Sequence, residues 1–272
     1  MIAAVRERLQ TAFSSSLRVM VAAYEQLLLF GDSITQAGAV EDGFGLTAPL
    51  QHAYQRRLDV VNRGFNGYNT ERALQVLPRL VPAASEAKVR LMTVFFGAND
   101  ASLPESTNKQ HVPLDQYTEN LRTICTHEAV KAQNPSMIII TPPPVNEYKM
   151  EMNDLAKGYR ALQRTAEHTQ AYANAARKVG EHLGIPVLDL WTIFMTRIGW
   201  VAGEPLPGSK STERHAVLEE LMYDGLHLSP KAYEIVVEEL MGLIARAYPE
   251  QVPVKLPYVY PDWKDTERWA RF

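Results

Sequence analysis

Short runs of apolar residues alternate with longer amphipathic segments from residue 26 to residue 248. Each run is rich in Val, Ile, Leu or Phe and is bounded by Gly, Pro, Asn or Asp. This alternation is typical of a parallel sheet whose strands are buried on both faces by helices. We predict five strands, at residues 26–30, 59–62, 90–96, 137–141 and 187–190.

The amphipathic segments between these runs predict the helices that cover the sheet. After Asp115, a good N-cap, apolar side chains at Tyr117, Leu121 and Ile124 follow the spacing of one helix face. The single cysteine, Cys125, lies beside this face, and we expect it to be a buried small hydrophobic residue. Helices are predicted at residues 46–57, 70–80, 115–132, 154–182 and 230–248.

The organisation of the chain favours a single domain. Its 272 residues fit one large domain or two small ones, but no repeat, low-complexity tract or Gly/Ser linker divides them. We therefore predict an N-terminal extension at 1–23, one domain at 24–250 and a C-terminal tail at 251–272. The fold class is α/β, a three-layer α/β/α flavodoxin-like fold with a five-stranded parallel sheet in the order 2-1-3-4-5. Ligands of such a sheet bind beyond the carboxyl ends of its strands, so reactive residues are expected just after strands.

Composition argues against several kinds of partner. Lys and Arg total 28 against 31 Asp and Glu, so the chain lacks the positive field that selects nucleic acid. One cysteine can form neither an intramolecular disulfide nor a Cys-rich zinc site, and no H-x-x-x-H or paired-carboxylate pattern indicates another metal site. No run approaches the roughly eighteen apolar residues of a membrane span.

The compartment depends on the first twenty residues. Three arginines, three consecutive serines and a single acid resemble an organelle-targeting peptide, whereas Arg18 interrupts the apolar run that a secretory signal needs. We expect a cytoplasmic protein, with mitochondrial targeting through the extension as the alternative. The sequence leaves the oligomeric state open, a homodimer included.

Polar and glycine-containing motifs follow the first three predicted strands. They are FGDSIT at 30–35, NRGFNGYNT at 62–70 and GAND at 97–100, and a fourth motif, YDGLHLSP at 223–230, leads into the last helix. A serine after an aspartate is often only an N-cap, so GDS alone is a weak signal. Together, the motifs lie where the predicted fold binds its ligand.

The spacing of Asp224 and His227 adds a specific chemistry. An aspartate three residues before a histidine in a turn can accept the Nδ1 proton, which leaves Nε2 free to take a proton from a serine. Of the seven histidines, only His227 combines this spacing with a loop that leads into a helix. We predict Ser33 as nucleophile, His227 as general acid and base, and Asp224 as the group that orients the imidazole.

The four motifs, in this order, resemble blocks I, II, III and V of the SGNH/GDSL hydrolase superfamily. Within it, VNRGFNGYNT (61–70), FFGANDA (95–101), QHVPL (110–114) and TPPPVNE (141–147) are most similar to the isoamyl-acetate-hydrolysing esterases of fungi, plants and animals. The resemblance runs from about residue 27 to residue 248. It implies an oxyanion hole made by the backbone N–H groups of Ser33 and Gly67 and the side-chain amide of Asn99, with no cofactor.

This resemblance implies a serine esterase that hydrolyses short-chain, acetyl-type esters of small alcohols. The alternatives are a thioesterase or lysophospholipase, a carbohydrate deacetylase of the same superfamily and, from a different class, a non-catalytic ligand-binding member of the fold. The lack of a secretory signal argues against a secreted polysaccharide deacetylase. A nucleotide-binding protein with the same sheet is disfavoured because the loop after the first strand has no Gly-rich phosphate cradle.

Several neighbours of the motifs are expected to support the site. Asp32 and Asp100 should hold turns by accepting backbone N–H bonds rather than transfer protons. Asn146 and Glu147 should bond neighbouring loops, with hydrogen bonds to the substrate as the alternative. The prolines at 142–144 make a stiff loop that either shapes the substrate pocket or is a rigid turn without substrate contact.

Overall fold

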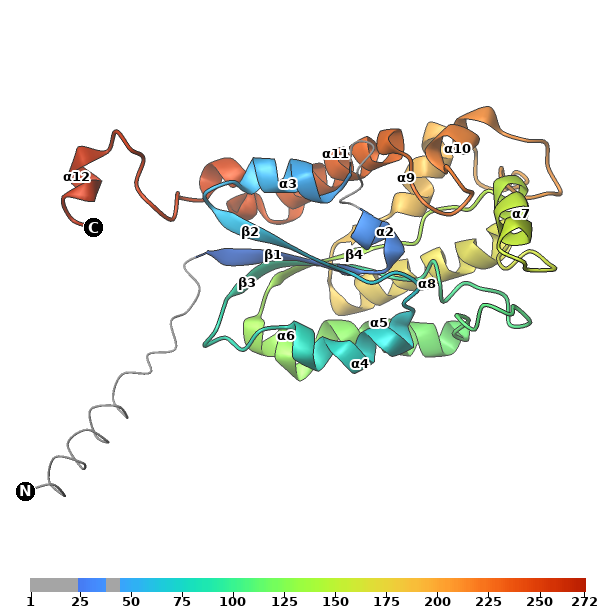
Figure 1. Cartoon of the computed structure of the whole chain (residues 1–272), viewed down its shortest axis with the longest axis horizontal. Coiled ribbons are helices and arrows are strands. Elements are labelled where there is room, and N and C mark those ends of the chain that lie inside the picture. Colours follow the sequence, from blue (N-terminus) through green and yellow to red (C-terminus); the bar gives the residue numbers. More distant parts are fainter. Residues whose placement is uncertain (1–23, 38–44) are drawn as a thin grey trace, which may run out of the picture.

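A five-stranded parallel sheet forms the centre of the computed structural model, which describes residues 24–37 and 45–272 (Figure 1). Its strand order, β2-β1-β3-β4-β5, confirms the predicted topology and fold class. The predicted extension at 1–23 lies outside the described residues. The strands are β1 (Glu25–Gly31), β2 (Leu58–Gly64), β3 (Val89–Phe95), β4 (Ser136–Ile140) and β5 (Val187–Leu188).

Helices cover both faces of the sheet (Figure 1). One face carries α3 (Thr47–Tyr54), α9 (Leu190–Arg197), α10 (Ala216–Leu221) and α11 (Pro230–Ala247). The other carries α4 (Thr70–Leu80), α5 (Leu114–Thr126), α6 (Glu128–Gln133) and α8 (Ala166–Leu183). The remaining helices are α2 (Ser33–Gln36), α7 (Glu147–Ala156) and α12 (Thr266–Trp269), with the 3₁₀ turns η2 (Pro249–Gln251) and η3 (Pro253–Lys255).

Alternation along β1, an inner strand of the sheet, explains why its sequence is continuously apolar. Leu27 and Leu29 point into the hydrophobic cluster beneath α3 and α11, whereas Leu28 and Phe30 point into the cluster beneath α4, α5 and α8. Successive side chains of a strand face opposite sides, so a strand between two helical layers needs apolar residues at every position. Cys125 is buried in the second cluster, as predicted, and burial raises the pKa of its thiol to about 12.

Two of the predicted helices are each two helices in the structure. The segment at 115–132 divides at His127, whose ring accepts the N–H of Ala129 and so caps α6. The segment at 154–182 was placed wrongly, because α7 ends near Gly158, where φ is +85°, and α8 begins only after Thr165, its N-cap. The residues between α7 and α8 are not helical.

The fifth strand is shorter than predicted, and two helices after it were not predicted. Asp189 accepts the N–H of Thr192 and starts α9, which ends β5 at Leu188. Except for Leu190, the first residue of α9, both helices lie where the sequence predicts neither a strand nor a helix.

The last residues contact the amino end of β2. Leu256 is buried in the main hydrophobic cluster, the N–H of Val259 donates to the carbonyl of Arg56 at 3.0 Å, and Arg56 forms an ion pair with Asp262. Among the helices of residues 24–37 and 45–272, none is both long and apolar enough to cross a membrane.

Candidate active site

The sequence motifs meet beyond the carboxyl ends of the central strands. Ser33 follows β1, Gly67 follows β2 and Asn99 follows β3, while Asp224 and His227 lie in the loop before α11. Neighbouring parallel strands end at the same edge of a sheet, so motifs that follow them are brought together. This is the location that the sequence analysis expected for the reactive residues.

Ser33 is held at the start of α2 by a tight turn. Asp32 is the N-cap, and its Oδ1 accepts the N–H of Ile34 at 2.9 Å. Gly31 must lack a side chain, because a Cβ there would lie 2.0 Å from the Thr35 hydroxyl and 2.7 Å from the Phe95 carbonyl. The serine side chain is 8% exposed, so its hydroxyl is mostly shielded from solvent.

Three side chains form a continuous chain of hydrogen bonds. The Oγ of Ser33 lies 2.9 Å from Nε2 of His227, a residue 194 positions later in the sequence. The Nδ1 of His227 lies 2.8 Å from Oδ2 of Asp224. With the proton on Nδ1, the imidazole donates to the carboxylate and accepts from the serine hydroxyl.

The loop around Asp224 keeps this carboxylate ionised. Its Oδ1 accepts the N–H groups of Leu226 at 3.0 Å and His227 at 2.8 Å, and Asn153 on α7 donates to Oδ2 at 3.3 Å. Burial would raise the pKa of Asp224, but the hydrogen bonds and the charge of the imidazolium outweigh it and lower the pKa to about 2. Asp224 is therefore an anion at every pH at which the site would work.

The loops that carry Gly67 and Asn99 are joined to each other and to α2. The amide Nδ2 of Asn99 donates to the carbonyl of Tyr68 at 2.8 Å, so Asn99 lies against the residue after Gly67. The side-chain Oε1 of Gln36 accepts the N–H of Asn66 at 2.7 Å, which fixes the same loop to the helix of Ser33. No hydrogen bond within the described residues joins Ser33 directly to Gly67 or Asn99.

Two buried aspartates beside these motifs hold turns, as predicted. Asp100 accepts both the N–H of Thr70, at 2.9 Å, and its hydroxyl, at 2.5 Å. Burial raises the pKa of Asp100 to about 6 and that of Asp32 to about 7. The second carboxyl oxygen of Asp32, Oδ2, is buried without a hydrogen-bond partner in the part of the chain that the structure describes.

The loop after β4 is buried and braces the site. Asn146 caps α7 through the N–H of Lys149, and Glu147 accepts the N–H groups of Ala166 and Lys210. The bonds of Glu147 confirm the supporting role predicted for it, whereas the side chain of Asn146 caps its own helix rather than bonding a neighbouring loop. A Cβ at Gly97 would lie 2.9 Å from Pro142, so this proline packs against the loop of Asn99.

Four residues at the site were not identified from the sequence. Tyr223 stacks on the His227 ring with centroids 5.9 Å apart, Asn153 contacts Asp224, and Gln110 and Arg164 surround Asn99. Gln110 begins one of the motifs that carry the resemblance, which was a usable signal. Arg164 lay inside a wrongly predicted helix and carried no signal.

No group of three or more His, Cys, Asp or Glu side chains in residues 24–37 and 45–272 is arranged to hold a metal ion. The polar groups at the site are instead a hydroxyl, an imidazole, a carboxylate and amide donors. A serine beside an imidazole that a carboxylate orients is the arrangement by which serine hydrolases are recognised.

Comparison with known proteins gives the family. The GDSL-like Lipase/Acylhydrolase family matches residues 29–235, and the chain belongs to this family. The isoamyl acetate-hydrolyzing esterase 1 homolog of Mus musculus is 37% identical over 246 residues, which cover 90% of this chain and 89% of the mouse protein. The isoamyl acetate-hydrolyzing esterase of Saccharomyces cerevisiae is 33% identical over 254 residues, which cover 89% of this chain and 95% of the yeast protein.

A solved structure agrees with these relatives. The lipase/acylhydrolase from Enterococcus faecalis superposes with a TM-score of 0.56 at 25% identity, and the match covers 86% of this chain and 98% of that one. The predicted enzyme class, a serine esterase of the GDSL type, is confirmed by the family and these relatives.

The raised pKa of Asp32 predicts a specific pH dependence of stability. In an unfolded chain an aspartate ionises near pH 4, whereas folded Asp32 keeps its proton until about pH 7. The folded state therefore binds the extra proton, and the contribution of Asp32 to the free energy of unfolding falls as the pH rises from 4 to 7. Asp32→Asn keeps the cap and removes this ionisation, so its stability relative to wild type should rise across that range by at most about 4 kcal/mol.

Urea unfolding at pH values from 4 to 8 measures this difference. Ser85→Ala is the control, since it exchanges one uncharged side chain for another at an exposed position outside the site, and its difference from wild type should be constant with pH. A constant difference for Asp32→Asn as well would show that Asp32 is not protonated in the folded state.

Proposed function

We propose that the protein hydrolyses short-chain carboxylic esters, in particular acetyl esters of small alcohols, through an acyl-enzyme formed on Ser33. The observation that carries the proposal is the hydrogen-bonded series from Asp224 through His227 to Ser33, with separations of 2.8 and 2.9 Å. Both distances lie within the reach needed for proton transfer between a nucleophile and its base. The same series is the argument against a non-catalytic, ligand-binding role.

In the first half of the reaction, the Ser33 oxygen attacks the acyl carbon while Nε2 of His227 takes the hydroxyl proton. The carbonyl oxygen becomes an oxyanion in a tetrahedral intermediate. When the intermediate collapses, the bond to the alcohol oxygen breaks, and His227 gives its proton to the leaving alcohol. Asp224 stabilises the imidazolium throughout, since its low pKa keeps it negatively charged.

In the second half, water replaces serine as the nucleophile. His227 takes a proton from the water, the hydroxide adds to the acyl carbon, and collapse of the second intermediate returns the proton to Ser33 and releases the acid. The exposed Tyr223 ring stacked on His227 restricts the imidazole plane during both proton transfers. No cofactor is needed for either half.

The oxyanion hole proposed for these intermediates comprises the N–H groups of Ser33 and Gly67 and the amide of Asn99. Gly67 has φ of +75°, a conformation that glycine adopts without strain, and Asn99 is 3% exposed. Donors that are fixed before the reaction and shielded from water stabilise a developing oxyanion most strongly. We further propose that residues 24–250 act as one catalytic domain, because the two ends of this range supply the reacting side chains.

The choice of short acyl chains follows from the relatives. Proteins named isoamyl acetate-hydrolyzing esterase match nearly the whole chain at 33–37% identity. The residues that carry the chemistry and the loops that brace them lie within the matched family region, 29–235. We therefore assign acetyl esters, rather than long-chain lipids, as the substrate class.

Removal of the nucleophile should abolish catalysis. Ser33→Ala should eliminate turnover of nitrophenyl acetate and labelling by a fluorophosphonate, and Asn99→Ala should lower kcat by about 10²–10³ because one oxyanion donor is lost. Ser85→Ala, at an exposed serine outside the site, is the matched control and should keep full activity. Wild-type turnover by Ser33→Ala would refute the assignment.

The acyl preference is tested with a series of nitrophenyl esters that differ only in acyl length. A site for acetyl esters should give the highest kcat/KM with acetate or another short acyl group and a decline as the chain lengthens. A maximum at eight carbons or more would overturn the substrate assignment and leave the catalytic mechanism intact.

A further inference from the structure

A buried arginine lies behind the oxyanion donors. Arg164 is 4% exposed and sits in the connection between α7 and α8. Within the described residues it takes part in no ion pair, and all its hydrogen bonds go to uncharged oxygens. A buried cation without a bound carboxylate is unfavourable for folding, so the presence of Arg164 needs an explanation other than stability.

The arginine fixes the orientation of Asn99. Its Nη2 donates to Oδ1 of Asn99 at 2.9 Å, and its Nε donates to the Ala98 carbonyl at 2.6 Å. A guanidinium can only donate, so the oxygen of the Asn99 amide must face Arg164 and the NH₂ group must face away. One of the two N–H bonds of that group binds Tyr68, which leaves the other for a ligand.

A second link runs from the same guanidinium to Gly67. Nη2 of Arg164 donates to Oε1 of Gln110 at 2.7 Å, and Nε2 of Gln110 donates to the Gly67 carbonyl at 3.2 Å. The carbonyl of Gln110 also accepts from Asn69 at 3.0 Å. Arg164 therefore holds the two loops that carry Gly67 and Asn99 in a single network.

We propose that Arg164 is a positioning residue for the oxyanion site, which sets the Asn99 amide directly and Gly67 through Gln110. This inference rests on the proposed function. Donation of a charge-assisted hydrogen bond to Oδ1 also polarises the amide and makes its free N–H a stronger donor. Arg164 does not touch the substrate and acts only through these two neighbours.

The test combines kinetics with binding of an aryl boronic acid, which adds to the serine and mimics the tetrahedral intermediate. Arg164→Met should lower kcat by about 10- to 100-fold, the effect of one hydrogen bond to a charged group, with little change in KM. Boronate affinity should fall by the same factor. In an Asn99→Ala background, Arg164→Met should cause little further loss, since its main target is already absent.

Two further variants keep the test decisive if Arg164→Met fails to fold. Arg164→Lys retains the charge without the planar set of guanidinium N–H donors and should recover part of kcat. Gln110→Ala should lower kcat by about 2- to 12-fold, the effect of one neutral hydrogen bond. Wild-type kcat and boronate affinity in the folded variants would overturn the role of Arg164. It would also be overturned if the loss of kcat in the double variant Asn99→Ala, Arg164→Met equalled the product of the two single-variant losses. If Ser33→Ala is inactive in the same assays, the proposed function stands even where the role of Arg164 is overturned.

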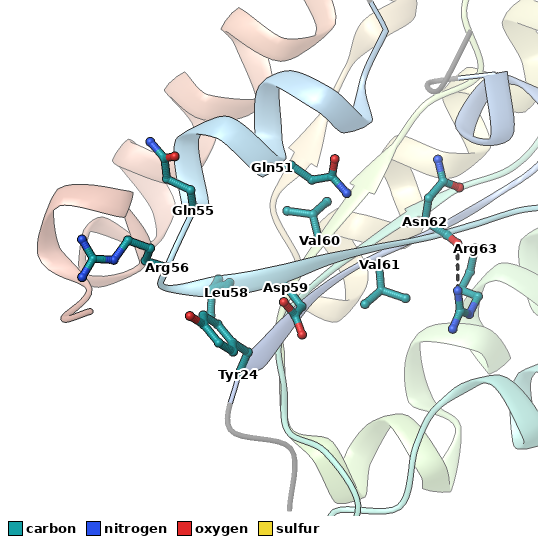
Figure 2. A pocket seen from close by; sticks show the side chains of 10 residues that line it. All are labelled: Tyr24, Gln51, Gln55, Arg56, Leu58, Asp59, Val60, Val61, Asn62 and Arg63. Carbon is teal, nitrogen blue, oxygen red and sulfur yellow. Dashed lines mark hydrogen bonds between the residues drawn. The ribbon is translucent and has the colours of Figure 1, made fainter. Parts of the chain in front are cut away.

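A separate observation concerns β2, the edge strand next to β1. A cavity of about 550 Å³ lies along it, and Ser33 is not among the residues that line it (Figure 2). The carbonyl of Asn62 accepts from the side chain of Arg63, and the N–H of Gly64 donates to Oδ1 of Asn62, whereas the N–H of Phe65 donates to the carbonyl of Gly31 in β1. Even-numbered residues of β2 thus present their backbone groups outward, and no strand of the described residues pairs with them.

The charges on this edge are self-complementary. Asp59, Val61 and Arg63 point to the same side of β2, and Val60 and Asn62 to the other (Figure 2). Asp59 and Arg63 are exposed and belong to no ion pair within residues 24–37 and 45–272. In an antiparallel pair with a two-fold axis at Val61, each Asp59 lies opposite the Arg63 of the other strand, and Val60 and Asn62 exchange backbone hydrogen bonds.

We propose that β2 pairs with β2 of a second copy of this chain in that register. The pairing satisfies the outward backbone groups of Val60, replaces the bond from Arg63 to the Asn62 carbonyl, and forms two symmetric ion pairs beside Val61. An unpaired edge is otherwise a site of uncontrolled association, and closure by a two-fold axis removes it.

Charge reversal tests the register. The full-length protein should sediment as a dimer at micromolar concentration. Asp59→Arg and Arg63→Asp should each weaken dimerisation, because like charges then face each other, and the double exchange should restore it. Glu181→Arg, an exposed reversal on α8, is the control and should leave the dimer intact.

A wild-type protein that sediments as a monomer would overturn the proposal. This holds also if hydrogen exchange shows that β2 is protected in the monomer, because another segment of the same chain then covers the edge. A dimer that is indifferent to both single reversals would overturn it as well.

Discussion

The site depends on a contact between two residues that lie 194 positions apart, Ser33 and His227. The parallel sheet is what makes this contact possible, since β1 delivers the serine to the carboxyl edge and the loop before α11 brings His227 to the same edge. A separation of 2.9 Å between Oγ and Nε2 has to be held without strain at either end. The surrounding polar groups serve that purpose.

Each of those polar groups makes at least one hydrogen bond, although Oδ2 of Asp32, Oδ2 of Asp100 and Nδ2 of Asn146 are buried without a partner within the described residues. Asp32, Asp100, Asn146 and Glu147 each accept backbone N–H groups at the start of a helix or turn. Buried polar groups that are fully bonded make a site rigid, whereas unpaired ones destabilise it. Glycines complete the arrangement where loops approach most closely. At Gly225, for example, a Cβ would lie 2.5 Å from the Asn146 carbonyl.

Much of the fold could be predicted because its signals are local. Apolar runs such as 26–30 predict the strands, and the spacing of Asp224 and His227 by itself predicts a hydrogen-bonded pair. The interruption between α7 and α8 could not be predicted in the same way. It depends on Gly158 and on the hydrogen bond that the N–H of Gln163 donates to Asp154, which joins residues whose sequence pattern predicts one continuous helix. Arg164 was missed for the same reason, since its partners Asn99 and Gln110 are more than fifty residues away.

The central claim is that Ser33 is the residue that becomes acylated. The most direct measurement is peptide mapping by mass spectrometry after treatment with a fluorophosphonate, which remains bound to an activated serine. The account predicts one modified residue, Ser33, and loss of the modification in a folded His227→Ala variant, where no base activates the hydroxyl. Complete inactivation with the label on a different residue would contradict it.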